Sequence, residues 1–193
     1  MEIKNRIIFQ KGSDSFEFGP IGEEDVTNHY VKALQNQKSY VQNIHADISL
    51  EKQKAYVKKI RASKNDAIFG LFVKGQLVGT SGVQNIKGPG FTSIGVLVFD
   101  KDERKKGYGK TLVWASAYLL SQTLGCSQFS AGMEKTNIAS FKTFKACGYD
   151  ILKEGKYDIL KEIKDCFIMK LNASDLVVPE DMSEIEIVAI NKK

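Results

Sequence analysis

Apolar runs in the middle of the chain are separated by turn residues at the spacing of a β-meander. Three such runs, rich in β-branched and aromatic residues, follow one another at residues 67–73, 77–86 and 91–99. Because the turn Lys74-Gly75-Gln76 joins the first two directly, the pattern predicts consecutive antiparallel strands. Upstream, Phe16–Phe18 predicts another short strand.

Apolar residues at helical spacing predict four helices. Residues 22–34 place three acids ahead of the apolar positions, which predicts a helix with its acids at the positive end. A second helix over Leu50–Ala62 would begin after the capping residue Ser49. Residues 109–124 are apolar on nearly every face and are followed by a glycine, which predicts a well-buried helix with a left-handed C-cap. The segment 137–146 predicts the last helix.

Strands also alternate with helices in the second half of the chain. They are predicted at residues 126–133, around 149–153, and at 166–171. An antiparallel meander followed by alternating helices and strands indicates a mixed α/β protein of the α+β class.

Composition places the chain among ordinary globular proteins. Of its 193 residues, 42% are hydrophobic and 26% are charged, and the net charge is +5. This mild excess suits anionic small molecules and is too weak to indicate nucleic acid. The N-terminus has no apolar signal region and no run is long enough to span a membrane, so we expect a cytoplasmic protein. Three distant cysteines without CxxC spacing predict buried thiols, and neither a disulfide framework nor a metal site.

A basic, glycine-rich stretch, Asp102–Leu112 (DERKKGYGKTL), follows the third strand of the meander. It contains GKT but is not a Walker A loop, because the first glycine of that motif would fall at Arg104. It is not a dinucleotide-binding fingerprint either, because Leu112 stands where the third glycine belongs. What remains is Arg-x-x-Gly-x-Gly, formed by Arg104, Gly107 and Gly109.

Two interpretations of this loop fit its position between a strand and a helix. Glycines let backbone N–H groups turn inward, the helix N-terminus adds partial positive charge, and Lys105, Lys106 and Lys110 would suit a pyrophosphate. The alternative is an ordinary strand-to-helix turn with solvated lysines, since short glycine motifs often occur by chance.

A second motif downstream favours the first interpretation. The segment NIASFKTFKACGY carries Asn137-x-x-Ser140, then Phe144 and Gly148-Tyr149. Together with SIGVLVFDKDERKKGYGKTL it resembles the GNAT superfamily, the acetyl-CoA-dependent N-acyltransferases, and in particular its ribosomal-protein and nucleotide-amino-sugar branches. Tyr149 replaces the usual phenylalanine. The resemblance implies an N-acetyltransferase core at residues 16–171.

The resemblance implies a fold and a cofactor, acetyl-CoA. The central sheet would be mostly antiparallel, with helices on both faces, and would splay between the strands at residues 94–99 and 126–133. The pantetheine arm would lie in this gap, and the loop amides would bind the pyrophosphate. The implied cofactor-binding residues are Leu97, Val98, Phe99, Arg104, Lys105, Lys106, Gly107, Tyr108, Gly109, Lys110, Asn137 and Phe144. For Asn137, capping of the last helix is the alternative.

The implied chemistry is attack of a primary amine on the acetyl thioester. Many relatives carry a tyrosine acid where this chain has Phe144, which cannot donate a proton. Ser140, one turn earlier, is the expected substitute, as in the ribosomal-protein branch; a helix-surface serine is the alternative.

The general base has several candidates. Glu134 follows a strand and could face the cleft, and His45 lies in the connection that forms the acceptor wall in relatives. The intrinsic pKa of histidine, about 6.5, suits a base. Asp100 and His29 are weaker candidates, and an ordered water could also serve.

The acceptor is expected to be a small-molecule amine. Lys54, Lys58 and Arg61 would form one basic face of a helix, either to bind a diphosphate or simply as a solvated surface. Because residues 65–109 resemble acetyltransferases that act on nucleotide-linked amino sugars, that class comes first. A protein N-terminus or another small amine is the alternative, and a non-catalytic nucleic-acid-binding module is a third.

Both chain ends extend past the core within a single domain, residues 1–193. The extensions, residues 1–12 and 172–193, are expected to add strands at Arg6–Gln10 and Glu184–Ile190. These strands could pair with each other or with a second subunit. We expect the C-terminal one to contribute to a homodimer contact, which would hide an exposed sheet edge.

Overall fold

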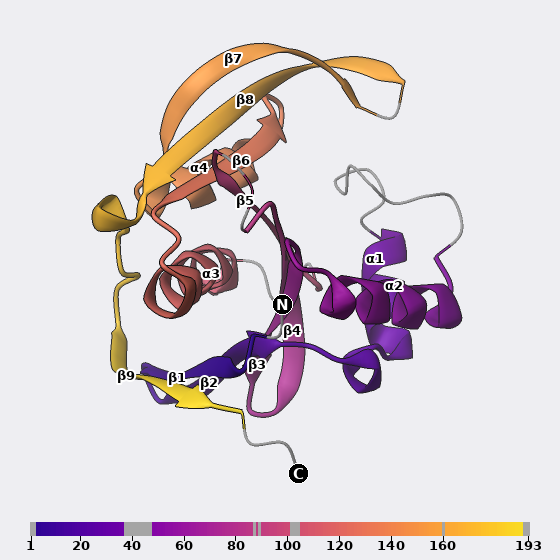
Figure 1. The fold of residues 1–193 in the computed structure, drawn as a ribbon, viewed down its shortest axis with the longest axis vertical. Helices are drawn as coiled ribbons and strands as arrows, with labels where there is room; N and C mark the ends of the chain where they lie inside the picture. The colour runs from indigo at the N-terminus through magenta and orange to yellow at the C-terminus, as the bar shows by residue number, and fades with distance from the viewer. Residues whose placement is uncertain are drawn as a thin grey trace.

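A computed structural model describes residues 3–36, 48–86, 88, 90–100, 105–159 and 161–190. Its nine strands form one sheet in the order β7-β8-β6-β5-β4-β3-β2-β1-β9, in which only β5 and β6 are parallel neighbours (Figure 1). The strands are β1 (Asn5–Lys11), β2 (Asp14–Pro20), β3 (Ala67–Val73), β4 (Gln76–Gln84), β5 (Thr92–Val98), β6 (Gln128–Glu134), β7 (Asp150–Ile159), β8 (Glu162–Asn172) and β9 (Met182–Ala189).

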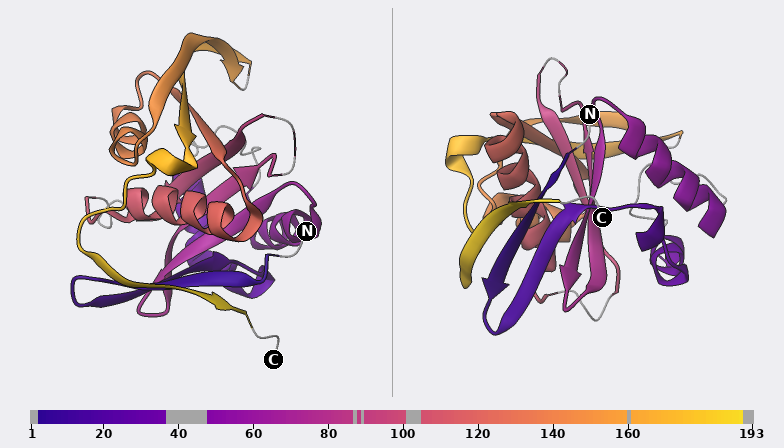
Figure 2. Two further views of the ribbon diagram at one scale, coloured as in Figure 1. Left: turned by 60° about the vertical axis from the view of Figure 1, so that its left-hand side comes forward. Right: turned by 60° about the horizontal axis from the view of Figure 1, so that its bottom comes forward.

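Among the described residues, four α-helices lie on both sides of this sheet, as the views in Figures 1 and 2 show. They are α1 (Asn28–Asn36), α2 (Leu50–Ala62), α3 (Tyr108–Leu124) and α4 (Ile138–Ala146). In Figure 1, α3 and α4 lie to one side of the central strands, and α1 and α2 to the other. The mixed α/β fold with a mostly antiparallel sheet is therefore confirmed.

The core has one hydrophobic cluster on each side of the sheet. The larger cluster surrounds α3, whose side chains are buried on most faces, as its sequence predicted. Trp114 of α3 is fully buried and contacts Phe9 edge-to-face, with 5.7 Å between ring centroids. The smaller cluster joins α1 and α2 to β3 through residues such as Tyr30 and Val57. The predicted left-handed C-cap of α3 is present at Gly125, with φ of 69°.

The helix predicted over residues 22–34 is wrong in its first part. Glu23–Asp25 form a single 3₁₀ turn, in which the Gly22 N–H donates to the Asp25 carboxylate at 2.7 Å. Val26 is extended, and α1 starts only at Asn28, where the Thr27 hydroxyl accepts from the Tyr30 N–H at 3.3 Å. Local side-chain hydrogen bonds therefore win over a continuous helix. Ser49 caps α2 as predicted, accepting from the Lys52 N–H at 3.3 Å.

Two strand predictions need extension. The strand predicted around residues 149–153 continues to Ile159 and forms a long hairpin with β8, which starts at Glu162. Most residues of β7 are exposed, so burial gave no sequence signal for its length. At the other edge, β1 pairs antiparallel with both β2 and β9, so the two terminal strands are neighbours within one chain. No helix in the described part of the chain is long and apolar enough to cross a membrane.

Candidate active site

The glycine loop opens α3 in a conformation that presents backbone N–H groups. Lys105 and Gly107 both have positive φ angles, 67° and 84°, and Gly107 is the N-cap residue of the helix. Because glycine supplies no capping side chain, the N–H groups of the first turn of α3 are suited to an anionic ligand. The predicted residue Arg104 lies outside the described residues.

Tyr108 and Gly109 fix this loop to the core. Tyr108 is 8% exposed and packs edge-to-face on Phe16, with 5.9 Å between ring centroids, so its side chain anchors the loop to the core. A Cβ at Gly109 would lie 3.4 Å from the Thr143 side chain and 4.0 Å from Val98. The N-terminus of α3 therefore packs against both α4 and β5.

The edge of β5 is open beside this loop. β5 pairs with β4 along its length, but with β6 only at Thr92 and Ser93, and then the two strands diverge as the resemblance implied (Figure 1). The Phe99 N–H donates to the Val78 carbonyl at 3.0 Å. Because bonding alternates along an antiparallel pair, Leu97 also turns its backbone groups towards β4, whereas those of Val98 face the gap.

The Asn137–Phe144 motif lies on α4, next to the loop. Asn137 is the N-cap: its Oδ1 accepts from the Ser140 N–H at 3.1 Å, so the capping role considered from the sequence is present. Ser140 lies half-buried in the first turn of α4. Phe144 is 2% exposed and packs edge-to-face on Tyr149, whose hydroxyl has no hydrogen-bond partner among the described residues. The side chain of Phe144 is thus a core residue.

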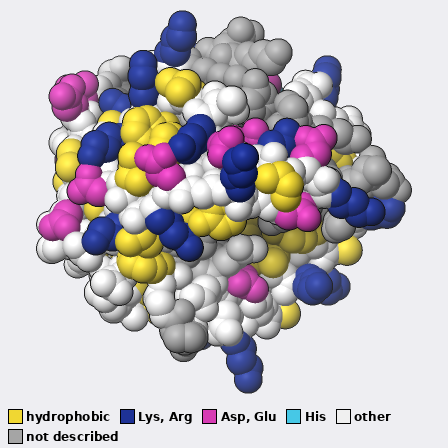
Figure 3. All heavy atoms as spheres, turned by 90° about the horizontal axis from the view of Figure 1, so that it is seen from above, with side chains coloured by type: hydrophobic (Ala, Val, Ile, Leu, Met, Phe, Trp, Pro, Cys, Tyr) yellow, Lys and Arg dark blue, Asp and Glu magenta, His cyan; other side chains and the backbone are white. Residues whose placement is uncertain are grey.

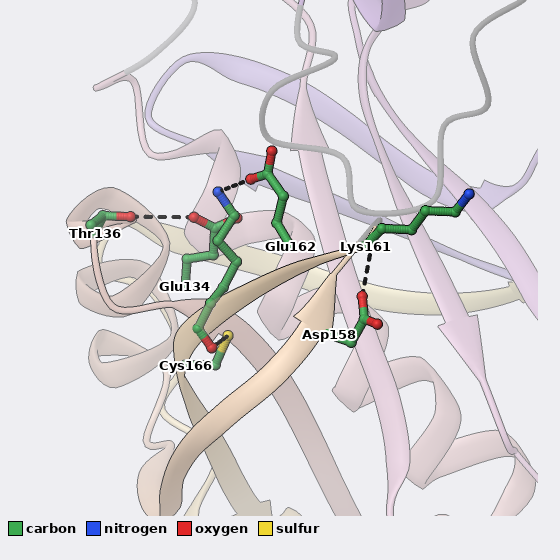
Figure 4. Close-up of polar contacts among 7 residues, drawn as sticks. Glu134, Thr136, Asp158, Lys161, Glu162 and Cys166 are labelled. Carbon is green, nitrogen blue, oxygen red and sulfur yellow. Dashed lines mark hydrogen bonds and ion pairs between the residues drawn. The ribbon is translucent and has the colours of Figure 1, made fainter.

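Glu134 ends β6 at the mouth of the same gap. Its carboxylate accepts a hydrogen bond from the Thr136 hydroxyl at 3.4 Å (Figure 4). On the paired strand β8, the hydrogen bond that Lys164 donates to Glu162, together with the negative charge of Glu134, raises the pKa of Lys164 above its usual value. A positive charge thus lies near Glu134. The other predicted base, His45, falls outside the described residues.

The fold brings together two residues that the sequence analysis treated separately. His29 of α1 and Asp100, just after β5, approach to 3.4 Å between Nε2 and Oδ2. Both side chains are about half exposed, at 53% and 51%, and the His29 ring contacts Phe99 edge-to-face. Helix α2 and strands β3, β4 and β5 lie between His29 and Asp100 in the sequence, so no motif or periodic spacing could have identified this pair.

The predicted basic face of α2 lies away from the loop. α2 packs against β3 and the turn Glu23–Asp25, and β4 separates β3 from β5. Lys58 approaches Glu23 at 3.9 Å, and Arg61 borders a cavity of about 300 Å³ that also includes Arg6 and Asp25. Burial raises the pKa of Asp25 in this cavity. These contacts place the basic face of α2 beside the Glu23–Asp25 turn, which is compatible with a solvated surface; binding of an acceptor diphosphate there stays a prediction.

The three cysteines are free thiols. Burial raises the pKa of Cys147 to about 12, and its Sγ lies 3.6 Å from the Lys110 carbonyl oxygen. Burial also raises the pKa of Cys126 and Cys166. In the described ranges no group of three or more metal-ligating side chains occurs.

Comparison with known proteins identifies the class of protein that carries this loop and gap. Residues 16–150 match the model of the acetyltransferase (GNAT) domain, so the chain belongs to the GNAT acetyltransferase family and is an acyl-CoA N-acyltransferase. Two solved structures of similar fold contain CoA or CoA-disulfide, and in this chain the first turn of α3 has no side-chain cap for its backbone N–H groups. No curated protein matches the chain.

Solved structures of similar fold include several acetyltransferases. RimJ from Mycobacterium smegmatis, in complex with CoA-disulfide, has a TM-score of 0.74 at 12% identity over 89% of this chain and 88% of that one. Spermidine N-acetyltransferase from Vibrio cholerae, in complex with CoA and spermine, gives 0.71 at 14% over 83% and 96%. Ribosomal-protein-S5-alanine acetyltransferase from Vibrio fischeri gives 0.70 at 17% over 84% and 96%. At these low sequence identities, the similarity between this chain and the three solved structures is a similarity of fold alone.

Proposed function

We propose that this protein transfers an acetyl group from acetyl-CoA to a primary amine, with a nucleotide-linked amino sugar as the first acceptor class. One observation carries the proposal: the uncapped N-terminus of α3 lies beside the open edge of β5. The loop donors would hold the pyrophosphate, and backbone groups near Val98 would bond to the amide-containing pantetheine arm.

The acceptor class rests on the resemblance of residues 65–109. The face that carries the β7–β8 hairpin does not favour one charge type: acids, lysines and apolar side chains are mixed there (Figure 3). The alternatives are a polyamine and a protein N-terminus, which two structural neighbours are named for.

A thiol-release assay with acetyl-CoA tests this proposal. The acceptors are nucleotide-linked amino sugars, N-terminal peptides and polyamines, each compared with a no-acceptor control. Thiol release with an amino sugar alone would support the first class, and release with another acceptor would replace it. If the protein binds coenzyme A but acetylates nothing in the panel, the amine classes named here are wrong. If it does not bind coenzyme A, the role of the loop is wrong.

Two side chains at the gap have catalytic roles in this proposal. Acetyl-CoA supplies the thioester that the amine attacks. The Ser140 hydroxyl donates a hydrogen bond to the departing sulfur, in place of the tyrosine that is absent at Phe144. Glu134 takes the amine proton. If the parallel register of β5 and β6 is continued past Ser93 and Ser130, Glu134 of β6 comes level with Leu97 of β5, so it lies along the gap where the arm would bind. His29 and Asp100 lie at the loop end of β5 and belong with the phosphate end of the arm.

Substitution of these two residues separates their roles. Ser140→Ala should lower kcat about tenfold, the worth of one hydrogen bond, with the Kd for coenzyme A unchanged. Glu134→Gln should lower kcat by about a hundredfold or more, because the amide cannot take the amine proton. Lys142→Ala, on an exposed position of α4, is the control. Unchanged kcat in either catalytic variant would remove that residue from the mechanism.

The terminal strands suggest how the protein assembles. In this proposal residues 1–193 form one domain, and β9 contributes to a homodimer contact because it is an edge strand of the sheet. Solution scattering over a concentration series should give the mass of two chains. A single-chain mass at the highest concentration would contradict this assembly.

A further inference from the structure

Lys11, the last residue of β1, lies against the phosphate loop. A Cβ built on Gly107 would be 3.5 Å from both Cε and Nζ of Lys11, so the lysine ammonium group lies close to the N-cap residue of α3. Lys11 precedes the part of the chain that matches the GNAT domain, which begins at residue 16. The N-terminal extension therefore delivers a positive charge to this loop.

Aromatic packing fixes the β1–β2 hairpin to the start of α3. Phe16 of β2 packs on Tyr108, the first residue of α3, and Phe9 of β1 packs on Trp114 two turns later. Both phenylalanines are at most 3% exposed. Because the contacts come from both strands of the hairpin, the core holds the backbone of Lys11 close to the start of α3.

The C-terminal extension holds the same hairpin from the other side. The Gly12 N–H donates to the Asp181 carbonyl at 3.3 Å, and Lys11 Nζ donates to the Glu180 carbonyl at 3.4 Å. Lys11 is also opposite Met182 in the β1–β9 pair. Both extensions thus position a residue at the cofactor loop.

The charge of Lys11 has no carboxylate partner among the described residues. Its only described acceptor is the neutral Glu180 carbonyl, at the long end of hydrogen-bond distance. The nearby hairpin acid, Asp14, instead pairs with Lys74 at 2.9 Å. An uncompensated ammonium group beside helix N–H donors favours a phosphate ligand.

We propose that Lys11 binds a phosphate group of coenzyme A, as a residue that the terminal extensions of this chain add to the cofactor site. The inference rests on the proposed function, because it takes the loop at Gly107 as the phosphate cradle. The ligand of Lys11 would be a phosphate oxygen, which belongs either to the pyrophosphate or to the 3′-phosphate of coenzyme A.

Calorimetric titration of the full chain with coenzyme A tests the proposal without requiring turnover. Lys11→Met keeps most of the aliphatic stem and removes the charge, and should raise the Kd about tenfold or more at low salt. Lys11→Arg should restore binding to within a few-fold. The control is Lys74→Ala, which removes a lysine of a neighbouring turn that is already paired with Asp14 and should leave the Kd unchanged.

Titration with dephospho-coenzyme A identifies the phosphate. If Lys11→Met weakens binding of both ligands equally, Lys11 contacts the pyrophosphate; if only binding of coenzyme A weakens, it contacts the 3′-phosphate. Wild-type affinity in Lys11→Met for both ligands would overturn the proposal while leaving the proposed function intact. Failure of the wild-type protein to bind coenzyme A would overturn both.

Discussion

A Gly107→Glu variant is expected to lose coenzyme A binding, with a Kd at least about a hundredfold higher and no detectable turnover. Two causes act together. The residue has a φ of 84°, which strains any side chain other than glycine. Its Cβ would also point at the Lys11 ammonium group, so the new carboxylate would pair with Lys11 and repel phosphate from the loop. Calorimetry with coenzyme A measures the loss.

Gly125→Glu is the matched control for this prediction. Gly125 caps the other end of α3 with a φ of 69°, and a Cβ there would meet nothing within 4 Å. It carries similar backbone strain and adds the same charge away from the loop. If both variants lose binding to the same extent, the effect is general destabilisation and the loop is not the phosphate site.

Gly148→Ala is expected to lower the free energy of unfolding by about 2–5 kcal/mol. Gly148 has a φ of 96°, and its Cβ would lie 2.3 Å from the Asp175 carbonyl oxygen, which is backbone and cannot rotate away. The same contact region holds the hydrogen bond from the Val177 N–H to the Cys147 carbonyl at 3.2 Å. The methyl group would therefore push the C-terminal extension away from α4. Urea unfolding measures the change.

Gly125→Ala again provides the comparison, because it places a side chain at a positive φ angle but without a steric clash. It should lose only about 1 kcal/mol, the usual cost of a side chain at such a position. Equal losses in the two variants would show that the Asp175 segment moves freely. In that case residues after β8 would not be packed on α4 as described.

The two glycines that flank α3 show what local sequence can specify. Gly107 and Gly125 mark the ends of α3 because each adopts a left-handed conformation that other residues rarely take, and a helix boundary depends on a few neighbouring residues. The apolar pattern of residues 109–124 likewise depends only on the chain itself, so the buried helix was predicted correctly. The same local reasoning failed at Glu23–Asp25, where capping hydrogen bonds competed with the helix.

The sequence by itself therefore determined the family, the order of the core strands and the glycine loop that opens α3, because turns, periodicity and motif spacing are local. The tertiary structure alone decided which distant residues meet. It paired β1 with β9, brought His29 to Asp100, buried Phe144, and placed Lys11 beside Gly107. These contacts join segments far apart in the chain and depend on how the strands and helices pack together, which no periodic pattern records.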